Sequence, residues 1–119
     1  VLKPLATQLA AAAALAGEAT RAAGQRMQAG EIRRTLANAA HYMTLLGHVT
    51  IGWMWLQQAM VAQTALRGAA GGDSDSDFYN GKLQACRFFF ATELPLVEHA
   101  ARLVREADAS AVDMRGEWF

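Results

Sequence analysis

The sequence contains few of the residues that cross-link a chain or interrupt a helix. Its 119 residues include one cysteine, Cys86, and two prolines, Pro4 and Pro95. A single cysteine excludes an internal disulfide and suits a reducing cytoplasm, so we expect a cytoplasmic protein. No stretch alternates apolar and polar residues as a half-buried strand does, so nothing favours a β-sheet. These absences leave an all-α chain as the prediction.

Net charge is also absent. Eleven basic and eleven acidic side chains give a formal charge of zero, which argues against nucleic-acid binding because that requires a net basic face. The charges are uneven, however. Residues 1–67 hold six basic and two acidic side chains, and residues 68–119 hold five and nine. Attraction between the halves explains this balance as well as an external ligand does.

Apolar side chains are abundant by comparison. They make up 53% of the chain against 18% for charged residues, a ratio that predicts surface intended for a partner. The length suits one domain over residues 1–119. Because the chain opens at Val1 and not at a methionine, we interpret it as an excised piece of a longer protein.

Glycine and proline divide the sequence into helical segments. Pro4 is a favourable first-turn residue and Gly30 a favourable terminator, which predicts a helix over residues 4–29. A second helix is expected over residues 31–66. Gly47 and Gly52 each weaken it by about 1 kcal/mol, a cost that a close helix crossing would offset.

A third helix is expected over residues 78–107, after a loop that ends in the N-cap Ser76 or Asp77. Pro95 lacks a backbone donor and predicts a kink or restart there. Ser110 and Asp113 have the spacing of a capping box for a short last helix. The predicted fold is therefore an antiparallel bundle of three long helices plus a short C-terminal helix.

A charge-free run covers residues 35–66. About 20 apolar residues are enough to span a bilayer, but polar residues such as Asn38, His48 and Gln57 interrupt this run and are costly in lipid. We favour a central helix covered by protein on several sides.

No group of residues assembles a catalytic or metal site. His41 and His48 lie about 10.5 Å apart along a helix, too far for one metal ion, and His99 is on another helix. The roles of the three histidines stay open. Cys86 lies in an apolar run and is interpreted as a small core residue. We predict no catalytic, cofactor-binding or metal-binding residue in this chain.

Three segments are similar to the C-terminal helical extension of a subgroup of bacterial acyl-CoA dehydrogenases. They are LANAAHYMTLLGHVTIGWMWLQQA (residues 36–59), FYNGKLQACRFFFATELP (residues 78–95) and the closing EWF (residues 117–119). The resemblance covers nearly the whole chain, although the alanine-rich first thirty residues contribute little. Cys86 stands where a small residue such as alanine is expected.

The resemblance implies a parent flavoprotein that oxidises the α–β bond of an acyl-CoA thioester with FAD and a glutamate base. Those parts belong to preceding catalytic domains, so this chain would hold neither FAD nor the base. It would pack on the catalytic body and contribute to homodimer contacts or to the acyl-tail end of the site. The candidate interdomain or dimer residues are Trp53, Trp55, Lys82, Arg87, Phe88 and Phe89. Lys82 and Arg87 are expected either to form ion pairs across the interface or to lie on a solvated face of the helix.

Two other functions remain open. One is a free-standing helical interaction module. The other is a membrane-surface module, which would bind lipid through the charge-free helix or through Arg21, Arg26, Arg33 and Arg34. The sequence settles neither the acyl-chain length that the parent accepts nor which surface meets which partner.

Overall fold

The computed structural model describes residues 2–68 and 74–119, and within these ranges it contains helices and no strand. The all-α class is therefore confirmed. The helices are α1 (Lys3–Gln28), α2 (Ile32–Leu36), α3 (Ala39–Gly68), α4 (Ser74–Thr92), α5 (Leu96–Glu106), α6 (Ser110–Asp113) and a 3₁₀ turn, η1 (Gly116–Trp118).

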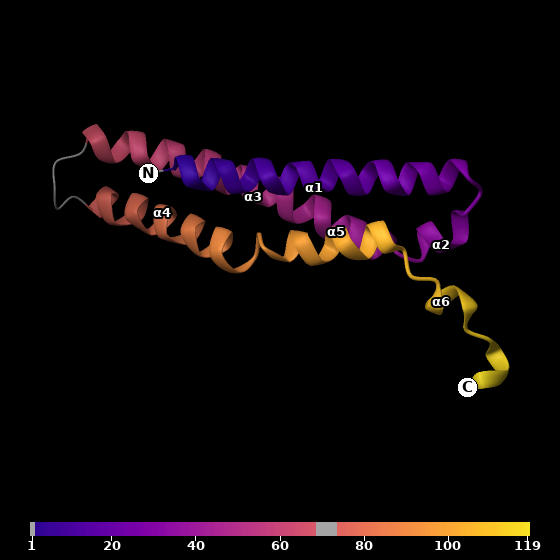
Figure 1. Cartoon of the computed structure of the whole chain (residues 1–119). Coiled ribbons are helices and arrows are strands. Elements are labelled where there is room, and N and C mark those ends of the chain that lie inside the picture. The colour runs from indigo at the N-terminus through magenta and orange to yellow at the C-terminus, as the bar shows by residue number, and fades with distance from the viewer. Residues whose placement is uncertain (1, 69–73) are drawn as a thin grey trace.

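The chain passes along the length of the molecule three times. Helix α1 runs one way, α3 returns, and α4 followed by α5 runs back again, while α6 and η1 lead away from the other helices (Figure 1). The Cα extents are 67 × 31 × 15 Å and the radius of gyration is 19.3 Å, against about 13.5 Å for a compact domain of this length. A body this thin leaves much of each helix uncovered.

The core lies where α1, α3, α4 and α5 meet. It combines small side chains from α1, such as Ala12, Ala16 and Ala19, with the larger Leu45 and Phe90. Alanine on α1 lets the neighbouring helices approach closely, so a thin body still forms a continuous apolar cluster. All three of these alanines are buried.

The prediction of one unbroken helix over residues 31–66 is wrong. The helix is interrupted between α2 and α3, at Ala37 and Asn38. Asn38 is buried, and its side-chain amide donates to the carbonyls of Arg34 (3.0 Å) and Asp108 (3.2 Å). An asparagine side chain that binds backbone carbonyls competes with the helix for the same groups, which explains the break.

The third predicted helix is interrupted near Pro95, as expected, but it begins earlier than predicted. Helix α4 ends at Thr92 and α5 begins at Leu96, with Pro95 as its N-cap residue. Ser76 and Asp77 are not N-caps, because α4 already begins at Ser74. The negative charge of Asp77 in the first turn still suits the helix dipole. Part of the predicted loop, residues 69–73, lies outside the described residues.

The capping box predicted for the last helix is also wrong. Ala109, not Ser110, is the N-cap residue, and its side chain forms no capping hydrogen bond. Instead the carboxylate of Asp108 accepts hydrogen bonds from the backbone N–H of Ser110 (2.9 Å) and from the Ser110 hydroxyl. These bonds hold the pKa of Asp108 below its ordinary value.

The two glycines of α3 differ in their surroundings. A Cβ on Gly52 would lie 3.2 Å from the Cδ1 atom of Leu9 and 3.3 Å from that of Leu94, so Gly52 is at the close crossing that the sequence predicted. A Cβ on Gly47 would meet nothing within 4 Å. The explanation by close packing is therefore correct for Gly52 and wrong for Gly47.

Candidate functional site

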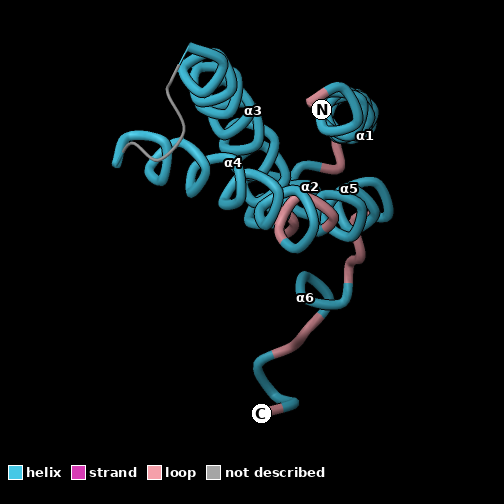
Figure 2. Tube along the Cα trace, turned by 90° about the vertical axis from the view of Figure 1, so that its left-hand side faces the viewer, coloured by secondary structure: helices cyan, strands magenta, loops and turns pink. Residues whose placement is uncertain are grey.

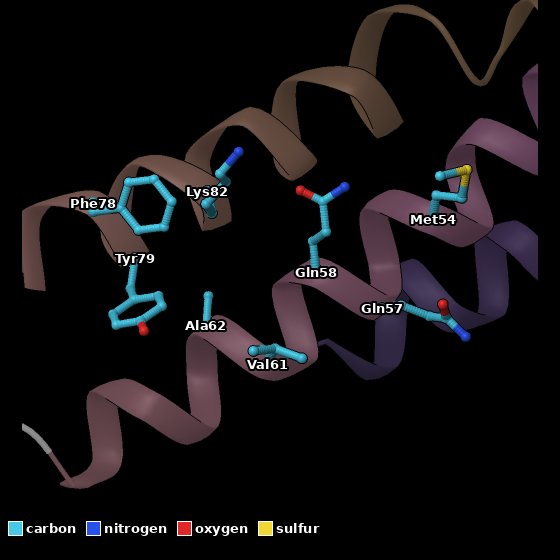
Figure 3. A pocket seen from close by; sticks show the side chains of 8 residues that line it. All are labelled: Met54, Gln57, Gln58, Val61, Ala62, Phe78, Tyr79 and Lys82. Carbon is cyan, nitrogen blue, oxygen red and sulfur yellow. The ribbon is translucent and has the colours of Figure 1, made fainter. Parts of the chain in front are cut away.

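A hollow lies between α3 and the start of α4, at the end of the molecule remote from α6. It has a volume of about 530 Å³. In Figure 3, Tyr79 points from α4 toward α3, and Gln58 points from α3 toward α4. We call it the α3–α4 pocket; its lining residues are Met54, Gln57, Gln58, Val61, Ala62, Phe78, Tyr79 and Lys82. Apolar walls with a few polar groups are typical of binding sites.

Lys82 is the one cation among these lining residues. Its ammonium lies 5.3 Å from the ring centroid of Phe78 and 5.7 Å from that of Trp55, within the range of a cation–π contact. Among the described residues no carboxylate forms an ion pair with it. The pocket therefore has a positive charge at an apolar wall.

The six interface residues proposed from the sequence do not share one surface. The structure brings together Trp55 and Lys82, as described above. Phe89 packs against the core and against the His48 ring, at 6.3 Å between centroids. Phe88 is exposed. Because consecutive helical residues point about 100° apart, it lies on a different side of α4 from Phe89. Trp53 is exposed on α3.

Arg87 has one hydrogen-bond partner among the described residues. Its guanidinium lies 3.5 Å from the side-chain oxygen of Gln84. Two carboxylates have other partners: Glu93 lies 3.6 Å from His48, and Glu106 lies 3.1 Å from Arg102. Among the described residues, neither Arg87 nor Lys82 forms an ion pair with a carboxylate.

Two arginines that the sequence analysis considered only for lipid binding, Arg26 and Arg34, close the end of α5. Arg26 donates to the carbonyls of Val104 and Arg105, the latter at 2.7 Å. Arg34 donates to the carbonyls of Glu106 (2.9 Å) and Ala107. Carbonyls in the last turn of a helix have no partner in the helix and carry partial negative charge. The excess of basic side chains in residues 1–67 was visible in the sequence. The structure shows that two of them bind backbone carbonyls.

His48 occupies a defined position near the α4–α5 break. Its Nδ1 lies 2.8 Å from the carbonyl oxygen of Thr44, and its Nε2 lies 3.6 Å from a carboxylate oxygen of Glu93. His41 is half-buried, and Nδ1 of His99 lies 3.4 Å from the guanidinium of Arg102. The three histidines do not converge on one site.

Cys86 is fully buried in the core cluster, as predicted for a small core residue. Burial raises the pKa of its thiol, and the nearby Arg87 partly offsets this, so the reactive thiolate is disfavoured. In residues 2–68 and 74–119, no three His, Cys, Asp or Glu side chains gather closely enough to hold a metal ion. Nor does any helix in these ranges combine the length and hydropathy that crossing a bilayer requires.

One side of α3 is exposed along nearly its whole length. Its residues follow spacings of three and four, a pattern typical of a helix that packs on another helix. The stripe carries no charge. We call it the α3 face; its residues are Met43, Leu46, Thr50, Trp53, Gln57, Met60 and Thr64.

Comparison with known proteins supplies the family. The chain is 32% identical over 76 residues to the broad-specificity linear acyl-CoA dehydrogenase FadE5 of Mycobacterium tuberculosis, a match that covers 64% of this chain and 12% of the relative. It is 34% identical over 68 residues to the butyryl-CoA dehydrogenase of Syntrophomonas wolfei, covering 57% of this chain and 11% of that protein. The chain thus spans only 12% of one relative and 11% of the other. The sequence profile described as "Acetyl-CoA dehydrogenase C-terminal like" matches residues 1–115, and the chain belongs to this family of acyl-CoA dehydrogenase C-terminal domains.

Proposed function

We propose that this chain is the non-catalytic C-terminal accessory domain of a flavin-dependent acyl-CoA dehydrogenase. The observation that carries the proposal is the family match over residues 1–115. The parent would oxidise the α–β bond of an acyl-CoA thioester, as the names of the two relatives suggest. This domain would contribute structure to that enzyme.

The α3 face is the surface that we assign to the catalytic body. It is uncharged and exposed from Met43 to Thr64 of the 30-residue helix α3, and its larger side chains are apolar. Monomeric proteins rarely leave an apolar stripe of this length in water. Helices of the catalytic domains that pack on it would bury the exposed Trp53 and Met60. From there the domain contributes to homodimer contacts or to the acyl-tail end of the site.

The flavin belongs to the catalytic domains in this proposal. The α3–α4 pocket is lined by the sides of two helices. Backbone N–H groups inside a helix are already used in its hydrogen bonds, so these walls offer no cradle for a dinucleotide pyrophosphate. The residues of the pocket therefore do not fit FAD, and no step of the oxidation is assigned to them.

The proposal is tested on the full polypeptide that contains residues 1–119. We expect a flavin absorption band and acyl-CoA-dependent reduction of an electron acceptor. Met60→Asp, which places a charge on the α3 face, is expected to lower the melting temperature of the full protein. The matched control Asn80→Asp adds the same charge to an exposed position on α4 and is expected to leave it unchanged.

Two results would reject the proposal. A colourless polypeptide without acyl-CoA-dependent activity would leave a helical interaction module. Equal effects of Met60→Asp and Asn80→Asp would reject the assignment of the α3 face while leaving the family membership intact.

The membrane-surface alternative is weakened by the roles of its arginines. Arg26 and Arg34 bind the end of α5, so two of the four cations considered for anionic lipid are engaged. Liposome sedimentation tests whether Arg21, Arg33 or the α3 face binds lipid. Binding by the α3 face would favour this alternative over docking on a catalytic body.

A further inference from the structure

Residues 108–119, which we call the arm, leave the helices without being covered by them. Figures 1 and 2 show α6 and η1 leading away from the other helices, on the side away from α3. No residue of α6 or η1 is buried. Trp118 is 63% exposed and Phe119 is 96% exposed. Two adjacent aromatic side chains in water are typical anchors of a protein interface.

The α3–α4 pocket has the complementary chemistry. It offers about 530 Å³ between apolar walls, and Lys82 supplies a positive charge that is unpaired within the described part of the chain. The arm carries Asp108, Asp113 and Glu117 against one cation, Arg115, and is therefore net negative. Glu117 directly precedes the two aromatic residues, so one docked segment would satisfy the apolar walls and Lys82 together.

The arm cannot reach the pocket of its own chain in this conformation. Its base is fixed beside Asn38, whose amide binds the carbonyl of Asp108. The pocket centre near Gln58 is twenty residues further along, or about 30 Å at 1.5 Å per residue. With α6 and η1 folded, residues 108–118 span at most about 25 Å, and they point away from α3.

We infer that the arm docks in the α3–α4 pocket of a second copy of this chain. Because the arm and the pocket lie toward opposite ends of an elongated molecule, two antiparallel copies can exchange arms reciprocally about a twofold axis. Each copy then supplies one arm and one pocket, which is the usual form of a closed homodimer contact. The pocket shares only Gln57 with the α3 face, so this contact and docking on a catalytic body are compatible.

The test is photo-crosslinking in the full polypeptide. A photoreactive phenylalanine analogue replaces Trp118 in one preparation, which is mixed with an isotopically heavy preparation of the same protein. After irradiation, we expect light–heavy crosslinks from position 118 to peptides that contain Val61 or Phe78. The same probe at Phe88, which is 64% exposed on the outer side of α4, serves as control and is expected to give at least about tenfold fewer such crosslinks.

A charge exchange then tests the polar contact. Lys82→Glu in the heavy chain is expected to lower the crosslink yield several-fold, and Glu117→Lys in the light chain is expected to restore it. Crosslinks confined to one chain, crosslinks to polypeptide outside residues 1–119, or equal yields from positions 118 and 88 would each overturn the inference. None of these results depends on flavin or on dehydrogenase activity, so they are separate from a failure of the proposed function.

Discussion

The rest of the chain covers the apolar side chains of helix α5 more completely than those of helix α3. On α5 the apolar side chains Val97, Ala100, Ala101 and Val104 are buried together, and the charged ones face water. The carbonyls at its end are bound by Arg26 and Arg34. On α3, apolar side chains occur on every side, and only part of the helix is covered. Helix α5 thus buries one apolar side within this chain, whereas α3 retains exposed apolar side chains along its length.

The largest expected effect comes from the same substitution on the two helices. Val104 on α5 is 3% exposed, and Val61 on α3 is 64% exposed. Val104→Asp buries an uncompensated charge and is expected to lower the free energy of unfolding by about 3–5 kcal/mol. Val61→Asp is expected to change it by less than about 0.5 kcal/mol. Chemical denaturation of the 119-residue chain measures both, and similar losses would contradict the comparison.

The two glycines divide α3 into a partnered and an unpartnered side. Gly52→Leu is expected to lower the free energy of unfolding by about 1–3 kcal/mol, because it crowds Leu9 and Leu94. Gly47→Ala is expected to raise it by about 1 kcal/mol, since alanine favours the helix and meets no neighbour. Thermal melts followed by circular dichroism test the pair. A destabilising effect of Gly47→Ala would show that a neighbouring group packs closely against Gly47.

The arginine caps account for how the end of α5 is fixed. Arg34→Met is expected to lower the free energy of unfolding by about 1 kcal/mol, because two carbonyls lose a charged donor at a partly exposed site. Arg33→Met is the control, since Arg33 is exposed and adjacent in sequence. Amide hydrogen exchange in residues 103–107 should accelerate in the first variant. Equal exchange in both variants would show that the caps do not hold this helix end.

The smallest effect concerns the start of the arm. The hydroxyl and backbone N–H of Ser110 lower the pKa of Asp108. A carboxyl whose pKa is lower in the folded state stabilises it above the unfolded pKa of about 3.9, and this contribution disappears as pH falls through the folded value. NMR chemical shifts of residues 110–113 should therefore report loss of α6 in acid. Asp108→Asn should remove that pH dependence, and its persistence would assign the change to another group.

The helical content of this chain is determined locally. Pro4, Gly30 and Pro95 act through their own backbone geometry, so the extent of α1 and the break between α4 and α5 could be predicted from the sequence. The same holds for the burial of Cys86 within an apolar run. The family resemblance also came from the sequence, through the segments at residues 36–59 and 78–95.

What the sequence could not provide depends on residues that are distant along the chain. The break at Asn38 requires the carbonyl of Asp108, seventy residues away, and Arg26 acts as a cap only because α5 ends beside it. The α3–α4 pocket likewise exists because two separate helices diverge around Lys82. Local backbone preferences therefore set which segments are helical, while the tertiary packing decided which charges are used and which apolar surface remains uncovered, because these depend on neighbours that only the folded chain brings together.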